Sequence, residues 1–234
     1  MKIALLGYGK MGKTIEAIAL NRGHDIVLKT SQSIASEITT ADVAIDFSIP
    51  KAAYNNISNC INHNVPVISG TTGWLENYPK ITALCEEKKG AFIYASNFSL
   101  GVNIFFELNK SLAKMMSTLK DYKVVIEEIH HTQKLDAPSG TAISLAEDII
   151  NNNANYNAWQ LDSNTNKTIP ITAKRIENVP GTHNITYNSE IDTIKLEHIA
   201  HSRQGFALGA VVAAEWLVGK TGVYTMKDVL SIND

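Results

Sequence analysis

The sequence has few cysteines, no long apolar run and almost no net charge, and each shortage excludes a class of protein. Its two cysteines, Cys60 and Cys85, fit neither a metal-ligand spacing nor a disulfide framework, which indicates a reducing compartment such as the cytoplasm. No apolar run approaches the roughly 20 residues that cross a bilayer. Met1 and Lys2 do not introduce a signal peptide with a small-residue cleavage site. A net charge of -2 provides no basic surface for nucleic acid or membranes. We therefore expect a cytoplasmic protein whose 234 residues form one large domain or two small ones.

A glycine-rich turn lies between the first predicted strand and the first predicted helix. Residues 2–6 form a short apolar run, and Gly7-Tyr8-Gly9-Lys10-Met11-Gly12 follows it. Ile15, Ile18 and Ala19 then recur at helical spacing. This G-x-G-x-x-G motif is typical of dinucleotide sites: its glycines permit a tight turn, backbone approach to a pyrophosphate and close packing of helix and strand. The alternative is a glycine turn that binds nothing, and the agreement between motif and context disfavours it.

Strands and helices alternate through the rest of the first hundred residues. Segments 25–28, 41–47, 65–69 and 91–95 are predicted strands, and a helix is predicted at 51–63. Gly70-Thr71-Thr72-Gly73 and Ser96-Asn97-Phe98 each follow a strand, at the end where open α/β sheets bind ligands. The pattern predicts an N-terminal, Rossmann-like, doubly wound parallel sheet of the α/β class.

The segment after the second strand bears on cofactor choice. An NAD site usually has an acidic residue there for the ribose hydroxyls, and none is present. Lys29, Thr30 and Ser31 occupy the position instead and could accept a 2′-phosphate. The alternative is that they are solvated loop residues. We therefore expect NADPH, or use of both NADPH and NADH.

The second half of the chain combines helices with consecutive strands. Helices are predicted at 101–118 and 141–150, and strands at 122–129, 169–176, 183–188 and 192–200. The first of these strands was predicted from the alternation of Val124, Ile126 and Ile129, and the asparagine-rich stretch 151–168 is expected to be a surface loop. Strands without helices between them indicate a mixed or antiparallel sheet, so we expect a smaller α+β domain, followed by a helix at 209–218.

Two adjacent histidines, a lysine and a Pro-Ser-Gly-Thr turn lie close together in this half. The segment reads His130-His131-Thr132-Gln133-Lys134-Leu135-Asp136-Ala137-Pro138-Ser139-Gly140-Thr141. Its histidines and lysine can carry positive charge and move protons. Its turn leads into a predicted helix, whose first backbone N–H groups can bind an anion. The pattern predicts a site for a small molecule that bears carboxylates.

These residues also have structural interpretations. His130 can be a histidine bonded to a backbone carbonyl, and Ser139 or Thr141 can be an ordinary helix N-cap. Lys134 can act as a cation for a substrate carboxylate and not as a proton donor. No metal site is expected, because the seven histidines include no H-x-x-x-H pair and the pair His198 and His201 lies on a strand and its end.

These segments resemble one family along nearly the whole chain. It is 4-hydroxy-tetrahydrodipicolinate reductase, long called dihydrodipicolinate reductase, of bacterial lysine and diaminopimelate biosynthesis. The matching pieces are the glycine turn at 7–12, Asp46-Phe47-Ser48, Gly70-Thr71-Thr72-Gly73, residues 96–103, the block from Glu128 to Ala142, and His201-Ser202-Arg203. The block from Glu128 to Ala142 is the most specific of them.

The resemblance implies a homotetrameric enzyme that uses NADH or NADPH to reduce a cyclic hydroxylated dicarboxylate to tetrahydrodipicolinate. It implies a discontinuous dinucleotide-binding domain at 1–97 and 204–234, and a substrate-binding and tetramerisation domain at 98–203, with hinges near Phe98 and Arg203. The chain departs from the family in lacking the acidic residue after the second strand. The alternatives are another Rossmann-type dehydrogenase, such as a homoserine or aspartate dehydrogenase, and a dinucleotide-binding protein without catalytic activity.

The resemblance also implies roles for single residues. It implies proton donation by His130 and Lys134, and substrate binding by His131, Ser139, Gly140 and Thr141. The cofactor-binding residues predicted from the motifs and the resemblance together are Gly7, Tyr8, Gly9, Lys10, Met11, Gly12, Lys29, Gly70, Thr71, Thr72, Ala95, Ser96, Asn97, Phe98 and Arg203. Arg203 rests on the resemblance alone, and a surface salt bridge is its alternative.

Overall fold

A computed structural model describes residues 1–30, 36–163 and 165–232, and the chain divides into two compact units. Unit 1 contains Met1–Leu100 and Arg203–Asp234, and unit 2 contains Gly101–Ser202. Ser31, named above as a possible phosphate-binding residue, lies outside the described residues. Within the described ranges, every helix is too short or too polar to cross a bilayer.

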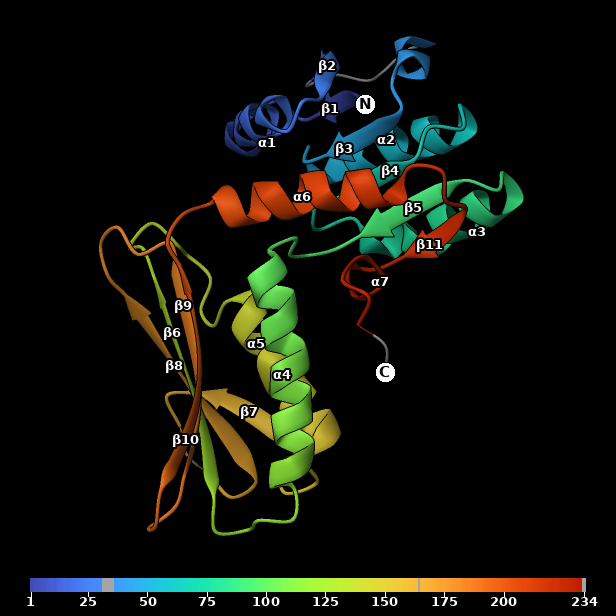
Figure 1. Ribbon diagram of the computed structural model, residues 1–234. Helices are drawn as coiled ribbons and strands as arrows, with labels where there is room; N and C mark the ends of the chain where they lie inside the picture. Colours follow the sequence, from blue (N-terminus) through green and yellow to red (C-terminus); the bar gives the residue numbers. More distant parts are fainter. Residues whose placement is uncertain (31–35, 164, 233–234) are drawn as a thin grey trace. The chain divides into compact units, whose positions relative to one another are not determined.

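Unit 1 contains a six-stranded parallel sheet with the order β11-β5-β4-β3-β1-β2 (Figure 1). Its strands are β1 (Lys2–Leu6), β2 (Asp25–Thr30), β3 (Val43–Asp46), β4 (Val67–Ser69), β5 (Ala91–Tyr94) and β11 (Gly222–Tyr224). The central strands are buried almost throughout, as expected of a parallel sheet covered on both faces. The strand order changes direction between β1 and β3, so the carboxyl ends of these strands form the switch point where such sheets bind ligands.

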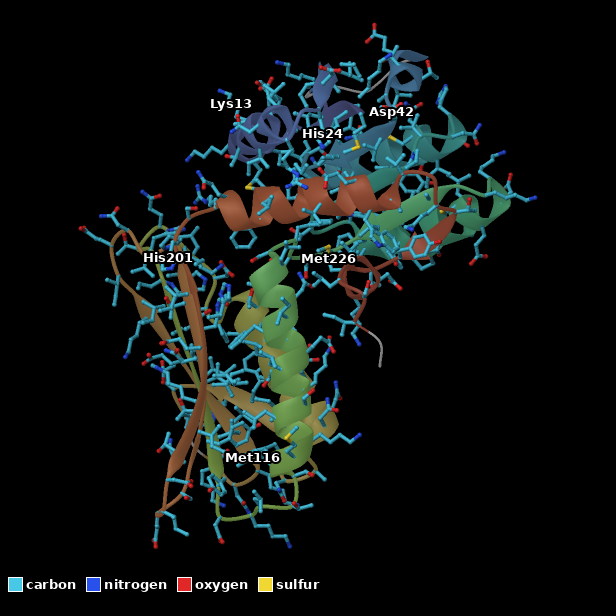
Figure 2. The ribbon with its side chains drawn as sticks, viewed as in Figure 1. Lys13, His24, Asp42, Met116, His201 and Met226 are labelled. Carbon is cyan, nitrogen blue, oxygen red and sulfur yellow. The ribbon has the colours of Figure 1, made fainter. Side chains whose placement is uncertain are left out.

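Helices cover the two faces of this sheet with separate apolar cores. Helices α1 (Lys10–Asn21) and α6 (Gln204–Leu217) bury Ile15 and Val211 against one face. Helices α2 (Pro50–Asn62) and α3 (Tyr78–Glu87) bury Ile57 and Ile81 against the other. Three short elements complete the unit, and Met226 of α7 is buried in the core of α1 and α6 (Figure 2). These elements are η1 (Ser36–Thr40), η2 (Leu75–Asn77) and α7 (Met226–Val229). The predicted doubly wound sheet is confirmed.

Unit 2 contains a mixed five-stranded sheet with the order β10-β9-β6-β8-β7. Its strands are β6 (Lys123–His130), β7 (Ala158–Leu161), β8 (Thr168–Arg175), β9 (Gly181–Asn188) and β10 (Thr193–Ala200). Strands β6, β8 and β7 are parallel, whereas β9 is antiparallel to both β6 and β10. Helices α4 (Leu100–Met116) and α5 (Gly140–Asn152) supply the core with residues such as Phe105 and Leu145. The predicted α+β arrangement with a mixed sheet is confirmed.

The short elements η1, η2, β11 and α7 were not predicted, and three longer segments also differ from the sequence prediction. Residues 151–168, expected to be a loop, contain β7, an edge strand with too little buried surface to leave an apolar pattern. Helix α6 begins at Gln204 and not near 209, because packing overrides the low helix propensity of Gly205 and Gly209. Helix α3 lies where no element was predicted, although its buried Ile81 and Cys85 are four residues apart, as on one helix face.

Candidate functional site

The buried face of β6 changes from apolar to polar along the strand. Val124, Ile126, Glu128 and His130 alternate on that face, so the last two place polar groups at the edge of the apolar core. Ile129 lies on the opposite face, and its grouping with Val124 and Ile126 in the sequence prediction was therefore wrong. Glu128 and His130 thus lie at the end of β6, beyond the apolar residues Val124 and Ile126 that pack in the core of unit 2.

Strand register brings further polar residues to the same place. Glu128 lies opposite His183 of the antiparallel strand β9, and His130 lies opposite Arg175 of the parallel strand β8. Four polar side chains from three strands thus meet near the carboxyl end of β6.

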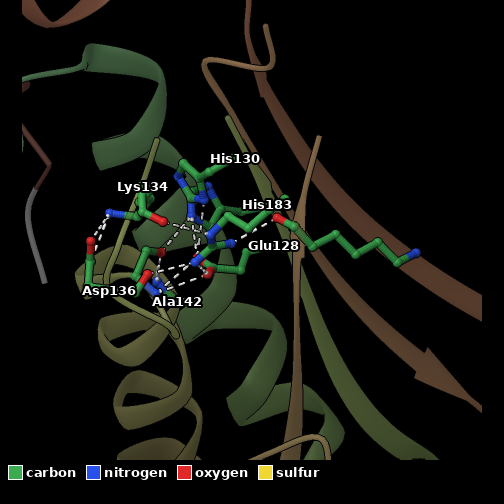
Figure 3. Close-up of polar contacts among 9 residues, drawn as sticks. Glu128, His130, Lys134, Asp136, Ala142 and His183 are labelled. Carbon is green, nitrogen blue, oxygen red and sulfur yellow. Dashed lines mark hydrogen bonds and ion pairs between the residues drawn. The ribbon is translucent and has the colours of Figure 1, made fainter. Parts of the chain in front are cut away.

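The carboxylate of Glu128 lies at the centre of this cluster (Figure 3). The residue is 0% exposed, and its two oxygens accept the backbone N–H of Ser139 at 3.1 and 3.0 Å. Arg175 Nη2 donates to Oε1 at 3.1 Å, while His130 Nδ1 and His183 Nε2 lie 3.4 and 3.8 Å from Oε2. A buried carboxylate is tolerated when it is paired and hydrogen-bonded, and Arg175 and Ser139 meet both needs.

Burial disfavours the charged forms of both histidines in the cluster. It lowers the pKa of His130 below the usual 6.5, and the Glu128 carboxylate opposes this shift. Burial lowers the pKa of His183 further, to about 3, so His183 is neutral at neutral pH. The two rings meet edge to face with centroids 5.1 Å apart. His130 is therefore a buried imidazole that can give up a proton readily.

The start of α5 presents backbone N–H groups next to this cluster. Ser139 is the N-cap, since its hydroxyl accepts the Ala142 N–H at 3.2 Å, and it also lies 3.2 Å from His183 Nε2. The first helical residues, Gly140 and Thr141, follow. A Cβ added at Gly140 would meet nothing within 4 Å, so the backbone there is accessible to a ligand. This helix start can hold a carboxylate.

Lys134 and Asp136 form an ion pair in the loop before α5. Lys134 Nζ donates to both carboxylate oxygens of Asp136, at 2.9 and 2.8 Å, and thereby lowers the pKa of Asp136. Arg175 fixes the same loop, because its Nε donates to the carbonyl of Lys134 at 3.3 Å and its Nη2 to that of Asp136 at 2.6 Å. Lys134 thus has a local anionic partner that a substrate carboxylate could replace.

The structure places His130, Ser139, Gly140 and Thr141 around one cluster, with the half-buried His131 just beyond the end of β6. Arg175 and His183 belong to the same cluster, and sequence reasoning did not single them out. Each lies on a predicted strand, but only strand register shows that they face β6.

Glu128, His130 and His183 are residue types that bind zinc, and one ligand atom from each lies within 4.8 Å of the others. However, the Glu128 oxygens already accept from Ser139 and Arg175. We therefore assign no metal to this cluster.

The glycine turn of unit 1 connects β1 to α1. Gly7 has a φ of +94°, and a Cβ there would lie 2.1 Å from the carbonyl oxygen of Phe47. A Cβ at Gly12 would lie 2.4 Å from the carbonyl oxygen of Gly7, whereas one at Gly9 would meet nothing within 4 Å. Packing therefore requires Gly7 and Gly12, and Gly9 leaves open space before the first N–H groups of α1. This geometry fits a bound pyrophosphate.

Asp46 organises the loops after β3 and β4. Its buried carboxylate accepts hydrogen bonds from Ser48 Oγ at 2.7 Å, Asn56 Nδ2 at 2.9 Å, Ser69 Oγ at 2.8 Å and Thr71 Oγ1 at 2.7 Å. The Thr71 hydroxyl also accepts the backbone N–H of Ser48 at 2.9 Å. The loop that begins at Gly70 is therefore held in place from inside the protein.

A cavity joins this loop to the glycine turn. Its volume is about 240 Å³, and its lining comes from Met11, Phe47, Ser48, Pro50, Gly70, Thr71 and Thr72. Four of these residues were predicted to contact the cofactor, and they come from two separate motifs. The residues present therefore fit a dinucleotide.

The predicted cofactor residues after β5 differ in exposure. Ser96 is exposed, Ala95 and Asn97 are half-buried, and Asn97 Oδ1 accepts the Ser99 N–H at 2.8 Å. Phe98 is only 1% exposed and packs against Phe47, with ring centroids 5.8 Å apart. Its side chain is thus part of the core. Lys10 is exposed in the first turn of α1, and Arg203 is exposed at the start of α6.

Lys29, predicted to accept a 2′-phosphate, is paired with Glu16 of α1. Lys29 Nζ lies 2.6 Å from Glu16 Oε1, and the Tyr8 hydroxyl donates to Oε2 of the same carboxylate. The hydrogen bonds from Lys29 and Tyr8 lower the pKa of Glu16. The charge of Lys29 is compensated, which weakens its attraction for a phosphate. The sequence prediction missed Glu16 because it sought an acidic residue after β2 only.

Comparisons with known proteins cover nearly the whole chain. The family model described as "Dihydrodipicolinate reductase, N-terminus" matches residues 23–98, and the one described as "Dihydrodipicolinate reductase, C-terminus" matches residues 101–230. A 4-hydroxy-tetrahydrodipicolinate reductase of Christiangramia forsetii is 62% identical over 234 residues, which cover 99% of this chain and 98% of that protein. The protein of the same name from Thermosipho africanus is 35% identical over 232 residues, or 98% of each chain.

A solved structure shows the same fold. Dipicolinate-bound dihydrodipicolinate reductase from Paenisporosarcina sp. TG-14 matches with a TM-score of 0.81 at 24% identity, over 96% of this chain and 97% of that chain. The two family models together match most of the chain, and both relatives are more than 30% identical over nearly its whole length, so the chain belongs to the dihydrodipicolinate reductase family.

Proposed function

We propose that this protein is an NAD(P)H-dependent 4-hydroxy-tetrahydrodipicolinate reductase, which forms tetrahydrodipicolinate in lysine and diaminopimelate biosynthesis. Membership of the family supports this function. The structural observation that carries it is the position of His130 in one polar cluster with the start of α5. A proton donor and a carboxylate site are thereby placed side by side.

Unit 2 supplies the groups that bind the cyclic dicarboxylate. The backbone N–H groups of Gly140 and Thr141, with the hydroxyls of Thr141 and Ser139, hold one carboxylate at the start of α5. His131 binds the substrate beside them. Lys134 binds a substrate carboxylate in place of that of Asp136, because each of these carboxylates offers two oxygens to the Lys134 ammonium group.

The reaction replaces a carbon–hydroxyl bond by a carbon–hydrogen bond and releases water. A reduced nicotinamide supplies the hydride, and the departing hydroxide takes up one proton. His130 donates that proton from its protonated form, which the Glu128 carboxylate favours and burial disfavours. Lys134 is the second candidate donor.

Unit 1 supplies the groups that bind the cofactor. Gly9 and the first N–H groups of α1 hold the pyrophosphate, and the loop from Gly70 to Thr72 lines the nicotinamide side with residues 95–98. Tyr8, Lys29 and Glu16, which bond to one another, would hold the ribose, and Arg203 at the start of α6 would contribute to cofactor binding.

We also infer from the family resemblance that the protein is a homotetramer. We infer a cytoplasmic location from its two cysteines, which are buried and unpaired. Light scattering tests the oligomer directly. A mass about four times 25.6 kDa supports it, and a monomer mass contradicts it.

The decisive assay follows nicotinamide absorbance while a synthase makes the substrate in situ from pyruvate and aspartate semialdehyde. We expect oxidation of NADPH or NADH that requires both the synthase and this protein. The variant His130→Gln should lose at least about 100-fold in kcat with cofactor affinity unchanged, the usual loss for a general acid. The control His63→Gln, at an exposed histidine of unit 1, should behave as wild type. A folded protein that binds NADPH but oxidises none would instead be a dinucleotide-binding protein without this activity.

Two substitutions separate the possible roles of Lys134. Lys134→Met removes both charge and proton, whereas Lys134→Arg keeps a cation that cannot give up its proton near neutral pH. If Lys134 only binds a carboxylate, Lys134→Arg should retain much of the activity that Lys134→Met loses. Equal loss in both variants supports proton donation.

A further inference from the structure

Glu128 has no part in the binding or chemistry described above, yet it contacts four segments of unit 2. Its carboxylate accepts the Ser139 N–H and the Arg175 guanidinium, and it faces His130 and His183. These partners belong to the start of α5, to β8, to β6 itself and to β9. Figure 3 shows its side chain between these groups.

The fold alone does not require a carboxylate at this position. Val124 and Ile126 occupy the preceding positions on the same face of β6, and both are apolar. Moving a carboxylate from water into a site that is 0% exposed is costly unless its partners offset the loss of hydration. Replacement of a buried ion pair by apolar residues is often neutral or stabilising. The charge is therefore better explained by the site than by the sheet.

We propose that Glu128 is the positioning residue of the reductase site, which with one carboxylate fixes both the His130 imidazole and the first turn of α5. This proposal rests on the proposed function. The bonds to the Ser139 N–H hold the turn that presents Gly140 and Thr141. His130 Nδ1 lies 3.4 Å from Oε2 and makes no hydrogen bond within the described residues, so the carboxylate holds the ring by charge attraction when the ring is protonated.

The same carboxylate also affects the proton affinity of His130. It favours the imidazolium form, whereas burial and the surrounding cations favour the neutral form. The groups that face His130 from all sides are Glu128, His131, Lys134, Arg175 and His183. Only Glu128 among them is an anion, so loss of its charge must lower the pKa of His130 further.

The variant Glu128→Gln tests this directly, because it keeps the shape of the side chain and removes its charge. We expect kcat to fall about tenfold or more, as for loss of an oriented general acid. We also expect the NMR titration of the His130 ring protons, assigned by comparison with His130→Gln, to move to lower pH. A residue with a purely structural role would not shift that titration.

Glu127→Gln is the matched control, since Glu127 is the preceding residue on β6 but lies on the opposite face and pairs with Lys174. Its kcat and its His130 titration should equal those of wild type. Glu128→Asp separates the effect of the charge from that of the side-chain length, because it keeps the carboxylate on a shorter side chain. It should leave the titration close to wild type, while kcat falls because the shorter side chain cannot contact both Ser139 and His130.

A folded Glu128→Gln protein with wild-type kcat and an unmoved His130 titration overturns the proposal. If Glu128→Gln does not fold, Glu128→Asp decides the question. The proposal requires a side chain long enough to contact both Ser139 and His130, so a wild-type kcat in Glu128→Asp would contradict it. If the wild-type protein turns over no substrate, the proposed function fails, and the NMR titration of Glu128→Gln still decides the role of Glu128.

Discussion

At the scale of single residues, each unit contains one buried carboxylate that holds a loop proposed to bind a ligand. Asp46 accepts side-chain hydrogen bonds from residues around the loop after β4. Glu128 accepts from the start of α5. Asp46 ends the apolar strand β3, and Glu128 follows two apolar residues on the buried face of β6, so both carboxylates are buried where a charge is costly unless fully bonded. The two loops are thereby set in position before any ligand arrives, which is what precise binding needs.

The pair of Glu16 and Lys29 leads to a prediction about cofactor preference. Glu16→Gln removes an anion that repels a 2′-phosphate and frees the charge of Lys29 to attract one. We expect the ratio of kcat/KM for NADPH to that for NADH to rise several-fold. Glu87→Gln, which breaks an exposed glutamate–lysine pair elsewhere in unit 1, is the control and should leave the ratio unchanged. A fall in the ratio for Glu16→Gln would exclude Glu16 as a barrier to the phosphate.

His183 leads to a prediction about stability and pH. Its pKa is about 3 in the folded protein, against 6.5 when unburied, so below pH 6.5 the unfolded chain binds a proton that the folded chain refuses. The free energy of unfolding should therefore fall with acidification, and between pH 7 and pH 5 this residue contributes about 2 kcal/mol of that loss. In His183→Gln, the free energy of unfolding measured by urea denaturation should fall by about 2 kcal/mol less than in wild type between pH 7 and pH 5. An equal loss in variant and wild type would contradict the burial of His183.

The residues that sequence reasoning found are those whose motif is local. The glycine turn and the segment from His130 to Thr141 are each contiguous, so their chemistry could be read along the chain. Arg175 and Glu16 could not be found in this way. Arg175 reaches β6 only through strand register, and Glu16 meets Lys29 only when α1 folds back along β2.

At the scale of elements, most helices and strands were predictable, including short buried strands such as β4, but β7 and α3 were not. The helix predicted at 51–63 is observed at Pro50–Asn62, and the strand predicted at 122–129 at Lys123–His130. Strand β7 was missed because an edge strand of four residues buries too little to show alternation. Helix α3 did have a usable signal, since Ile81, Leu84 and Cys85 recur at helical spacing.

The packing of α6 leads to a prediction at this scale. A Cβ at Gly209 would lie 1.7 Å from the carbonyl oxygen of Phe98, so Gly209→Ala must push the helix away from the loop after β5. We expect a destabilisation of about 3 kcal/mol or more in urea denaturation, although alanine is the better helix former. Gly205→Ala on the same helix is the control. Its Cβ would meet only Ser99 Oγ, at 3.6 Å, so its stability should be unchanged or slightly raised.

At the scale of the whole molecule, unit 1 depends on residues that follow unit 2 in the chain. Helix α6 fills the same core as α1, and β11 extends the sheet by pairing with β5. A local pattern cannot show which sheet a late strand joins, so the sequence indicated this return only through the family resemblance. Residues 1–100 alone lack α6, which together with α1 covers one face of their sheet.

Two glycines, one in each unit, allow the two ligand sites to be tested separately. Gly9 and Gly140 each begin a helix, and a Cβ at either would meet nothing within 4 Å of the protein itself. Alanine should therefore leave the fold intact and obstruct only a ligand that approaches the backbone there. We expect Gly9→Ala to weaken the binding of NADPH about tenfold in calorimetry, which corresponds to about 1.4 kcal/mol, and to leave the KM for the proposed cyclic dicarboxylate unchanged.

Gly140→Ala should have the converse effect, because the methyl group crowds the carboxylate at the start of α5 and not the pyrophosphate at the start of α1. Each variant is thus the control for the other, and both should unfold at nearly the urea concentration of wild type. If Gly140→Ala weakened NADPH binding as much as it raised the KM for the proposed dicarboxylate, the assignment of one ligand to each unit would be wrong. If neither variant weakened its ligand, the open space beside these glycines would have no role in binding.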